Sequence, residues 1–169
     1  SNGHGQLTLY HHDLGDGPAR PMYTNESGTD AIGPRTPHYA LWSPDGLKVA
    51  LVAKTWSDGL TLVLLDVHGQ KPPNRIISGM PLFVSWSPDS RLLLVHCGRR
   101  HYLVDPKEDG ATVRMPGGSS KYMAPSWARG ENTMAIAQEE AEGGQALLVG
   151  GTAEGTARRL TQFNGPAAF

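Results

Sequence analysis

A short motif repeats along this chain and constrains its fold more than any other feature. Residues 42–46 read Trp-Ser-Pro-Asp-Gly, residues 86–90 read Trp-Ser-Pro-Asp-Ser, and a weaker third copy begins at Trp127. Phe169 stands where a fourth copy would begin, and the spacings are 41 to 44 residues. This period, with short strands in each repeat, is typical of β-propellers. We therefore expect an all-β propeller, partial or few-bladed, with four-stranded antiparallel blades and repeats of about 42 residues.

Each repeat predicts the same order of strands and turns. The first complete repeat predicts strands at 39–42, 49–53, 60–67 and 74–78. The following repeats predict strands at 83–86, 92–96, 101–104 and 112–115, and then at 125–127, 134–137, 146–150 and 157–161. The second strand starts seven residues after each Trp, at Val49, Leu93 and Met134. This shared register argues against chance similarity.

The same register predicts the blade boundaries within one propeller portion, 1–169. We expect a half blade over 5–36, blades over 37–80, 81–121 and 122–164, and the inner strand of a next blade over 165–169. The half blade would hold only a third and an outer strand. An open series of blades exposes apolar flanks. Three alternatives follow: a fragment of a longer protein, a homodimer that closes the ring, or a small ring closed by Phe169.

Composition excludes several classes of function. Lys and Arg total 15 and Asp and Glu total 16, so net charge gives no reason to expect nucleic acid as a partner. Cys97 is the one cysteine, which rules out an intrachain disulfide and leaves the compartment open. No apolar run reaches the ~18 residues of a membrane span. We expect no cofactor.

The repeated motif resembles a known repeat family. The Trp-Ser-Pro-Asp-Gly signature at 42–46, the apolar strand after it, and Leu160-Thr161 on an outer strand are similar to PD40 repeats, which are WD40-like. These repeats occur in TolB propellers and in the non-catalytic propellers of prolyl-oligopeptidase and dipeptidyl-peptidase relatives. The resemblance covers 37–169. It departs from the pattern at Ser90, which replaces glycine, and at 128–130, where Ala-Arg-Gly replaces Ser-Pro-Asp.

The resemblance implies a non-catalytic scaffold that binds a protein or peptide, in a periplasmic or other extracytoplasmic compartment. As the alternative, it implies a substrate-gating propeller of a serine peptidase whose catalytic domain lies outside this chain. The sequence itself contains no Gly-x-Ser-x-Gly nucleophile elbow, so we expect no catalytic residues here.

The repeated residues are interpreted as structural. The aromatic residues at the repeat position are expected to pack between blades, because function rarely recurs in every repeat. Asp45 and Asp89 are expected to satisfy backbone donors in their turns rather than to bind a metal. The aromatic set is Trp42, Trp86, Trp127 and Phe169.

Two histidine pairs are candidate metal ligands. His11 and His12 are adjacent on a predicted strand and therefore point to opposite faces. His96 and His101 flank a short loop and can lie opposite each other across a hairpin. The arginines at 99 and 100 would repel a cation there, so we expect a polar hairpin end and no metal, with a metal site as the alternative.

The loops between second and third strands are candidates for partner recognition. These loops and the blade connections, 24–37 and 116–124, lie on one face of a propeller. Trp and Arg are enriched at interface hot spots, and neighbouring basic and acidic loops would orient a partner. The candidate binding residues are Trp56, Arg99, Arg100, His101, Glu139 and Glu140.

Overall fold

The computed structural model describes residues 8–15, 17–24, 39–55, 59–107, 111–115, 117–118, 124–140, 144–152 and 157–163. The chain divides into two compact units, Ser1–Gly79 and Met80–Phe169. Every regular element in the described residues is a β-strand. None of these residues belongs to a helix that is long and apolar enough to cross a membrane.

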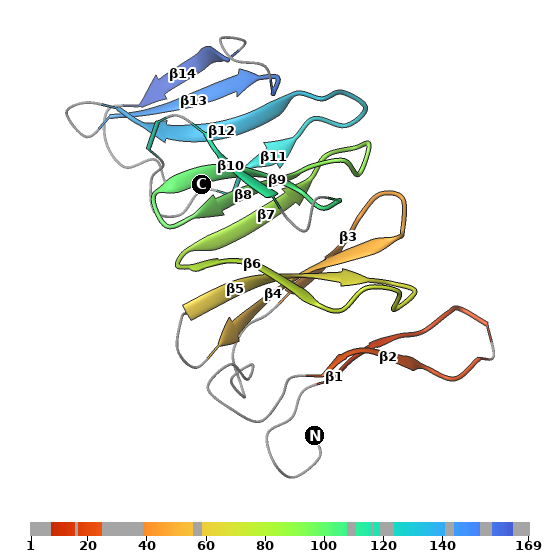
Figure 1. Cartoon of the computed structure of the whole chain (residues 1–169). Helices are drawn as coiled ribbons and strands as arrows, with labels where there is room; N and C mark the ends of the chain where they lie inside the picture. Colours follow the sequence, from red (N-terminus) through yellow and green to blue (C-terminus); the bar gives the residue numbers. More distant parts are fainter. Residues whose placement is uncertain are drawn as a thin grey trace. The chain divides into compact units, whose positions relative to one another are not determined.

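The first unit contains a two-stranded and a four-stranded antiparallel sheet (Figure 1). The small sheet pairs β1 (Thr8–His11) with β2 (Arg20–Thr24). The larger sheet has the order β3-β4-β5-β6, so each strand pairs with the next one in sequence. Its strands are β3 (Tyr39–Trp42), β4 (Lys48–Thr55), β5 (Gly59–Asp66) and β6 (Asn74–Gly79).

The second unit contains two four-stranded antiparallel sheets, ordered β7-β8-β9-β10 and β11-β12-β13-β14. The strands of the first are β7 (Leu82–Trp86), β8 (Leu93–Cys97), β9 (Arg100–Asp105) and β10 (Ala111–Arg114). Those of the second are β11 (Ser126–Trp127), β12 (Met134–Glu139), β13 (Gln145–Gly150) and β14 (Arg158–Phe163). The expected all-β class and the four-stranded antiparallel sheets are confirmed.

The inner strands of each sheet form the core. All five residues of β8 are buried, and so are five consecutive residues of β5. Such continuous apolar runs suit strands that are covered on both faces. Between the two sheets of the second unit, Leu94 of one sheet packs with Trp127, Met134 and Ile136 of the other.

A bulge recurs where the third strand of a sheet pairs with the outer strand. The register shifts between Leu62 and Val63 in β5 and between Leu147 and Leu148 in β13. A matching shift lies between Leu9 and Tyr10 in β1, opposite Pro21 of β2. The β9–β10 pairing has no such shift, and the half blade expected over 5–36 stays a prediction.

The Ser-Pro-Asp turn is held by a side-chain network that is the same in both intact copies. Ser87 N donates to Leu92 O (2.9 Å), and Leu92 N donates back to Ser87 Oγ (2.9 Å). The Ser87 hydroxyl donates to Asp89 Oδ1 (2.6 Å), which also accepts from Arg91 N. Asp45 makes the equivalent bonds in the first copy. The prediction that these aspartates satisfy turn donors is confirmed.

The third copy keeps the backbone of this turn without its side chains. Ala128 N donates to Thr133 O (2.7 Å), as the serine at this position does in the other copies. In the two intact copies the residue with positive φ is the fourth of the turn, Gly46 in one and Ser90 in the other. In the third copy it is the third residue of the turn, Gly130. Glycine adopts the φ of +79° at this new position without the strain that a side chain would add. The turn of the third copy therefore differs from that of the two intact copies.

The repeated aromatic residues are not equally buried. Trp86 and Trp127 are each 8% exposed, as expected for residues of the core. The prediction is wrong for Trp42, which is 48% exposed. In the described residues the sheet before Trp42 has two strands, β1 and β2, whereas Trp127 contacts Ser85 of β7 and Leu94 of β8 in the four-stranded sheet before it. Phe169 lies outside the described residues.

Candidate functional site

The candidate site lies at one end of the two sheets of the second unit. The β8–β9 connection is a two-residue turn, Gly98-Arg99, with φ of +62° at Gly98. Gly98 N donates to Pro81 O (2.9 Å), which ties the turn to the start of β7. In the next sheet, β12 ends at Glu139 on the same side. This end is called the hairpin edge below: Gly98–Arg100, Gly117–Gly118 and Glu139–Glu140.

Two ion pairs hold the charged side chains of the hairpin edge. Arg99 pairs with Glu139 across the two sheets, and Arg159 of β14 pairs with Glu140. Arg159 also donates to Gln162 Oε1 (2.9 Å). The Arg99 side chain remains 66% exposed, so water screens its pair and the pair adds little stability. It does fix where the charges stand.

A glycine pair runs between the two sheets at this edge. Gly118 forms an isolated antiparallel bridge with Glu139, whose N donates to Gly118 O (3.1 Å). Gly117 has φ of +86°, and a Cβ there would come within 2.9 Å of Gln138 Cδ. The positive φ favours glycine at Gly117, and a side chain there would also have to displace the end of the Gln138 side chain. This bridge places residues 117–118 beside Arg99.

The imidazoles of His96 and His101 are buried behind the turn. They are direct cross-strand partners, and their ring centroids lie 4.9 Å apart. The ring of Phe83 lies 5.9 Å from that of His96. His96 Nε2 donates to Gly98 O (2.9 Å), because a carbonyl oxygen can only accept. The hairpin end is therefore polar, as expected, but its two imidazoles are buried.

His101 is held neutral by its surroundings. It is 3% exposed, and its Nε2 has no hydrogen-bond partner among the described residues. Burial, with the nearby His96 as a second cause, lowers the pKa of His101 from 6.5 to about 4. For the alternative of a metal site, the described parts of the chain contain no group of three or more His, Cys, Asp or Glu able to hold an ion.

The structure brings together some of the predicted site residues and separates others. Arg99, Glu139 and Glu140 gather at the hairpin edge, and Arg100 is half-buried beside them at the start of β9. His101 lies in the interior instead of at the surface. Trp56 lies outside the described residues. The sequence does not point to Arg159. The partner of this side chain depends on how the strands of its sheet pair, for which the sequence contains no local signal.

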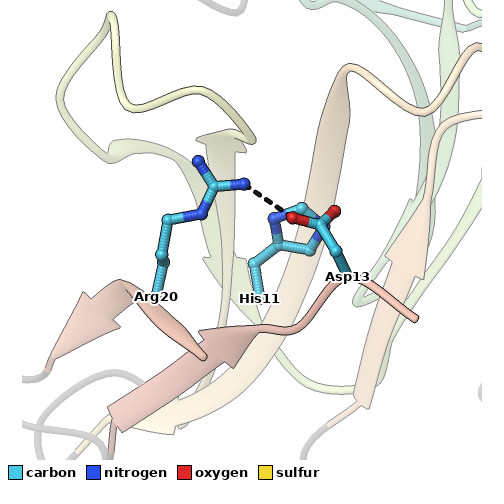
Figure 2. A network of polar contacts seen from close by, with 3 residues as sticks. All are labelled: His11, Asp13 and Arg20. Atoms are coloured by element: carbon cyan, nitrogen blue, oxygen red, sulfur yellow. Dashed lines mark hydrogen bonds and ion pairs between the residues drawn. The ribbon is translucent and has the colours of Figure 1, made fainter. Parts of the chain in front are cut away.

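A second polar network lies in the first unit. Figure 2 shows Arg20 of β2 reaching Asp13, with His11 of β1 beside them. Arg20 Nη2 lies 2.9 Å from Asp13 Oδ2, and His11 Nε2 lies 3.5 Å from Asp13 Oδ1. The ring of His11 also contacts that of Trp42, with centroids 5.4 Å apart. His11 and Arg20 are register partners, so hairpin pairing was the signal that could have found this network.

No family model matches the chain, and a search of curated proteins finds no match. Solved structures do match. A structure designated TolB, from Agrobacterium tumefaciens, aligns with 95% of this chain at a TM-score of 0.58 and 19% identity. TolB from Acinetobacter baumannii aligns with 91% at a TM-score of 0.59 and 19% identity. This chain covers 56% and 37% of those chains, respectively. The likeness establishes the fold, a partial β-propeller.

Proposed function

We propose that this chain is a non-catalytic propeller scaffold that recognises a protein or peptide partner at the hairpin edge. The observation that carries the proposal is the Arg99–Glu139 pair, which joins two sheets and fixes opposite charges at one end of both. Charged groups that are already positioned in the free chain lose little freedom on binding, so they present a prepared surface. The fold likeness to TolB structures and the PD40 resemblance support a scaffold role and an extracytoplasmic location.

The charges indicate what the partner would present. Arg99 is largely exposed even though it binds Glu139, and guanidinium has five N–H donors. It can therefore also bind a carboxylate or a backbone carbonyl of a partner. Arg100 stands next to it, while both glutamates already have arginine partners. The edge therefore favours an acidic segment. His101 would support the turn from behind, and Trp56 stays a predicted contact.

Binding of selected peptides tests this proposal. Peptides that bind the immobilised chain would be selected from a displayed random library, and their affinity measured by fluorescence anisotropy. Arg99→Ala should weaken binding about tenfold, or ~1.4 kcal/mol. Arg91→Ala is the matched control, because Arg91 is exposed in the β7–β8 turn at the other end of the same sheet.

The Glu139→Gln variant distinguishes direct contact of Arg99 with a partner from the positioning of Arg99 by Glu139. This variant removes the ion pair that positions Arg99 but keeps the Arg99 guanidinium, so its affinity should fall between those of the parent chain and Arg99→Ala. Equal losses in Arg99→Ala and Arg91→Ala would overturn the proposed site. So would a set of selected peptides that bind all these variants alike.

A further inference from the structure

Two histidines share one row of side chains behind the hairpin edge. His96 of β8 is the direct partner of His101 of β9 on one side and of Phe83 of β7 on the other. Direct partners in an antiparallel sheet point to the same face, so the three rings lie beside one another on that face. The centroids of the two imidazoles are only 4.9 Å apart. A charge on one imidazole therefore acts strongly on the other.

The neighbouring sheet covers this face. Leu94 lies two residues before His96 on β8 and therefore points to the same face. Leu94 packs in one cluster with Ile136 of β12 in the other sheet. His96 is 0% exposed and His101 is 3% exposed. Both imidazoles are thus buried, although the exposed Arg99 lies only two residues before His101.

The polar contacts of the pair involve the turn between β8 and β9. His96 Nε2 donates to Gly98 O (2.9 Å), and Gly98 N donates to Pro81 O (2.9 Å). His101 Nε2 is buried and has no hydrogen-bond partner among the described residues. A buried polar atom without a partner is costly, and a buried charge without one costs far more. The closed turn therefore requires a neutral His101.

The described groups around His101 do not compensate a positive charge. Of the titratable side chains beside it on its own sheet, only His96 shares its face. The others point to the opposite face by strand alternation, and they are Cys97, Arg100, Tyr102 and Arg114. On β12 of the neighbouring sheet, Gln138 is uncharged and Glu139 is already paired with Arg99.

These surroundings make opening of the turn sensitive to acid. Burial, and then the nearby His96, lower the pKa of His101 from 6.5 to about 4. If the turn opens and the ring reaches water, the pKa returns toward 6.5. The opened form then binds more protons than the closed form below pH 6.5, so a fall in pH favours opening.

We propose that the pair of His96 and His101 is a pH-sensitive switch of the hairpin edge. Uptake of a proton by His101 opens the β8–β9 turn toward water and separates Arg99 from Glu139. The turn is the part that opens, because it has two residues and exposes Arg99, whereas all of β8 is buried. The switch is a property of the free chain. Release of a bound partner in acid would follow from it, and that consequence alone rests on the proposed function.

Amide hydrogen exchange of the isotope-labelled full chain, followed by NMR at pH 7 and pH 5, tests this proposal. Gly98 N reports on the turn. Ser87 N, which donates to Leu92 O at the other end of the same sheet, reports on unfolding of the sheet. After correction for the intrinsic effect of pH on exchange, the protection of Gly98 should fall about tenfold or more from pH 7 to pH 5. At pH 5, Ser87 should remain at least about tenfold better protected than Gly98.

Three variants assign the titrating group. His101→Gln removes the ring and should abolish the fall in Gly98 protection. His68→Gln is the matched control, because His68 is exposed in a turn of the first unit, and it should show the same fall as the parent chain. Glu139→Gln should also show this fall, because its carboxylate is not the group that takes up the proton.

Several results would overturn the switch. One is a Gly98 protection that is equal at both pH values, or that falls equally in the parent chain and in His101→Gln. Equal protection of Gly98 and Ser87 at pH 5 is another, because the whole sheet would then unfold instead of the turn. Should His101→Gln fail to fold, the ring nitrogen shifts of His101 in the parent chain must titrate together with Gly98 exchange, and separate midpoints would contradict the proposal. Absence of peptide binding at pH 7 would overturn only the proposed function.

Discussion

The indole of Trp127 donates a 3.1 Å hydrogen bond to the backbone oxygen of Ser85, which joins β11 to β7 of the neighbouring sheet. The same ring packs with Leu94 and Ile136. The repeated aromatic position therefore does two things: it fills the space between sheets and it satisfies a backbone acceptor.

Substitution of Trp127 should separate these two contributions. Trp127→Phe keeps most of the packing and loses the hydrogen bond, which should lower the free energy of unfolding by about 1–2 kcal/mol. Trp127→Ala also opens a cavity and should cost about 3–5 kcal/mol. Urea unfolding followed by circular dichroism measures both. Trp42→Phe is the control, and a loss as large as that of Trp127→Phe would contradict the assigned bond.

The serine hydroxyl of the Ser-Pro-Asp turn is expected to stabilise the turn. Ser87 is buried, and Ser87→Ala removes the acceptor of Leu92 N and the donor to Asp89. Unfolding should become easier by about 1–2 kcal/mol. Ser126→Ala, at an exposed serine with one long bond of 3.4 Å, should change stability by less than about 0.5 kcal/mol. If both variants were equally stable, the hydroxyl network would not hold the turn.

His101 makes stability depend on pH in a defined window. Its pKa is about 4 in the folded chain and 6.5 in the unfolded chain, so the unfolded chain binds more protons between these values. Its contribution is complete above pH 6.5 and is lost as pH falls to 4, by on the order of 3 kcal/mol. Denaturant titrations between pH 7 and 4 measure this loss. In His101→Gln the slope should be absent, and an unchanged slope would assign the effect to other groups.

Cys97 should react slowly in the folded chain. It lies on β8 at 9% exposure, and burial raises the pKa of its thiol above the usual 9.0. Since the thiolate is the reactive form, an aromatic disulfide reagent should modify the native chain at least about 100-fold more slowly than the urea-unfolded chain. Comparable rates in the two states would show that β8 is not buried in solution.

The sequence predicts the local structure well because the signals are local. Proline, aspartate and a positive-φ residue define the turn at 86–90, and alternating and continuous apolar runs define the strands around it. The ends of several strands shift by one or two residues, as at Leu93–Cys97 against the expected 92–96. Strand limits depend on pairing, which composition alone does not fix.

The features that depend on packing between sheets could not be predicted. The sequence gives no signal that Arg99 meets Glu139 forty positions away, because the bridge between Gly118 and Glu139 decides it. The burial of His101 likewise depends on the neighbouring sheet. The exposure of Trp42 contradicts its repeat position, because a repeat specifies the residue and not the cover supplied by the preceding strands.

Chemical-shift mapping of a selected peptide on the isotope-labelled full chain tests the central claim of recognition at the hairpin edge most directly. The proposal predicts that the perturbed backbone amides cluster at Gly98–Arg100, Gly118 and Glu139–Glu140. Perturbations centred on the Ser-Pro-Asp turns at the opposite end of the sheets would contradict it.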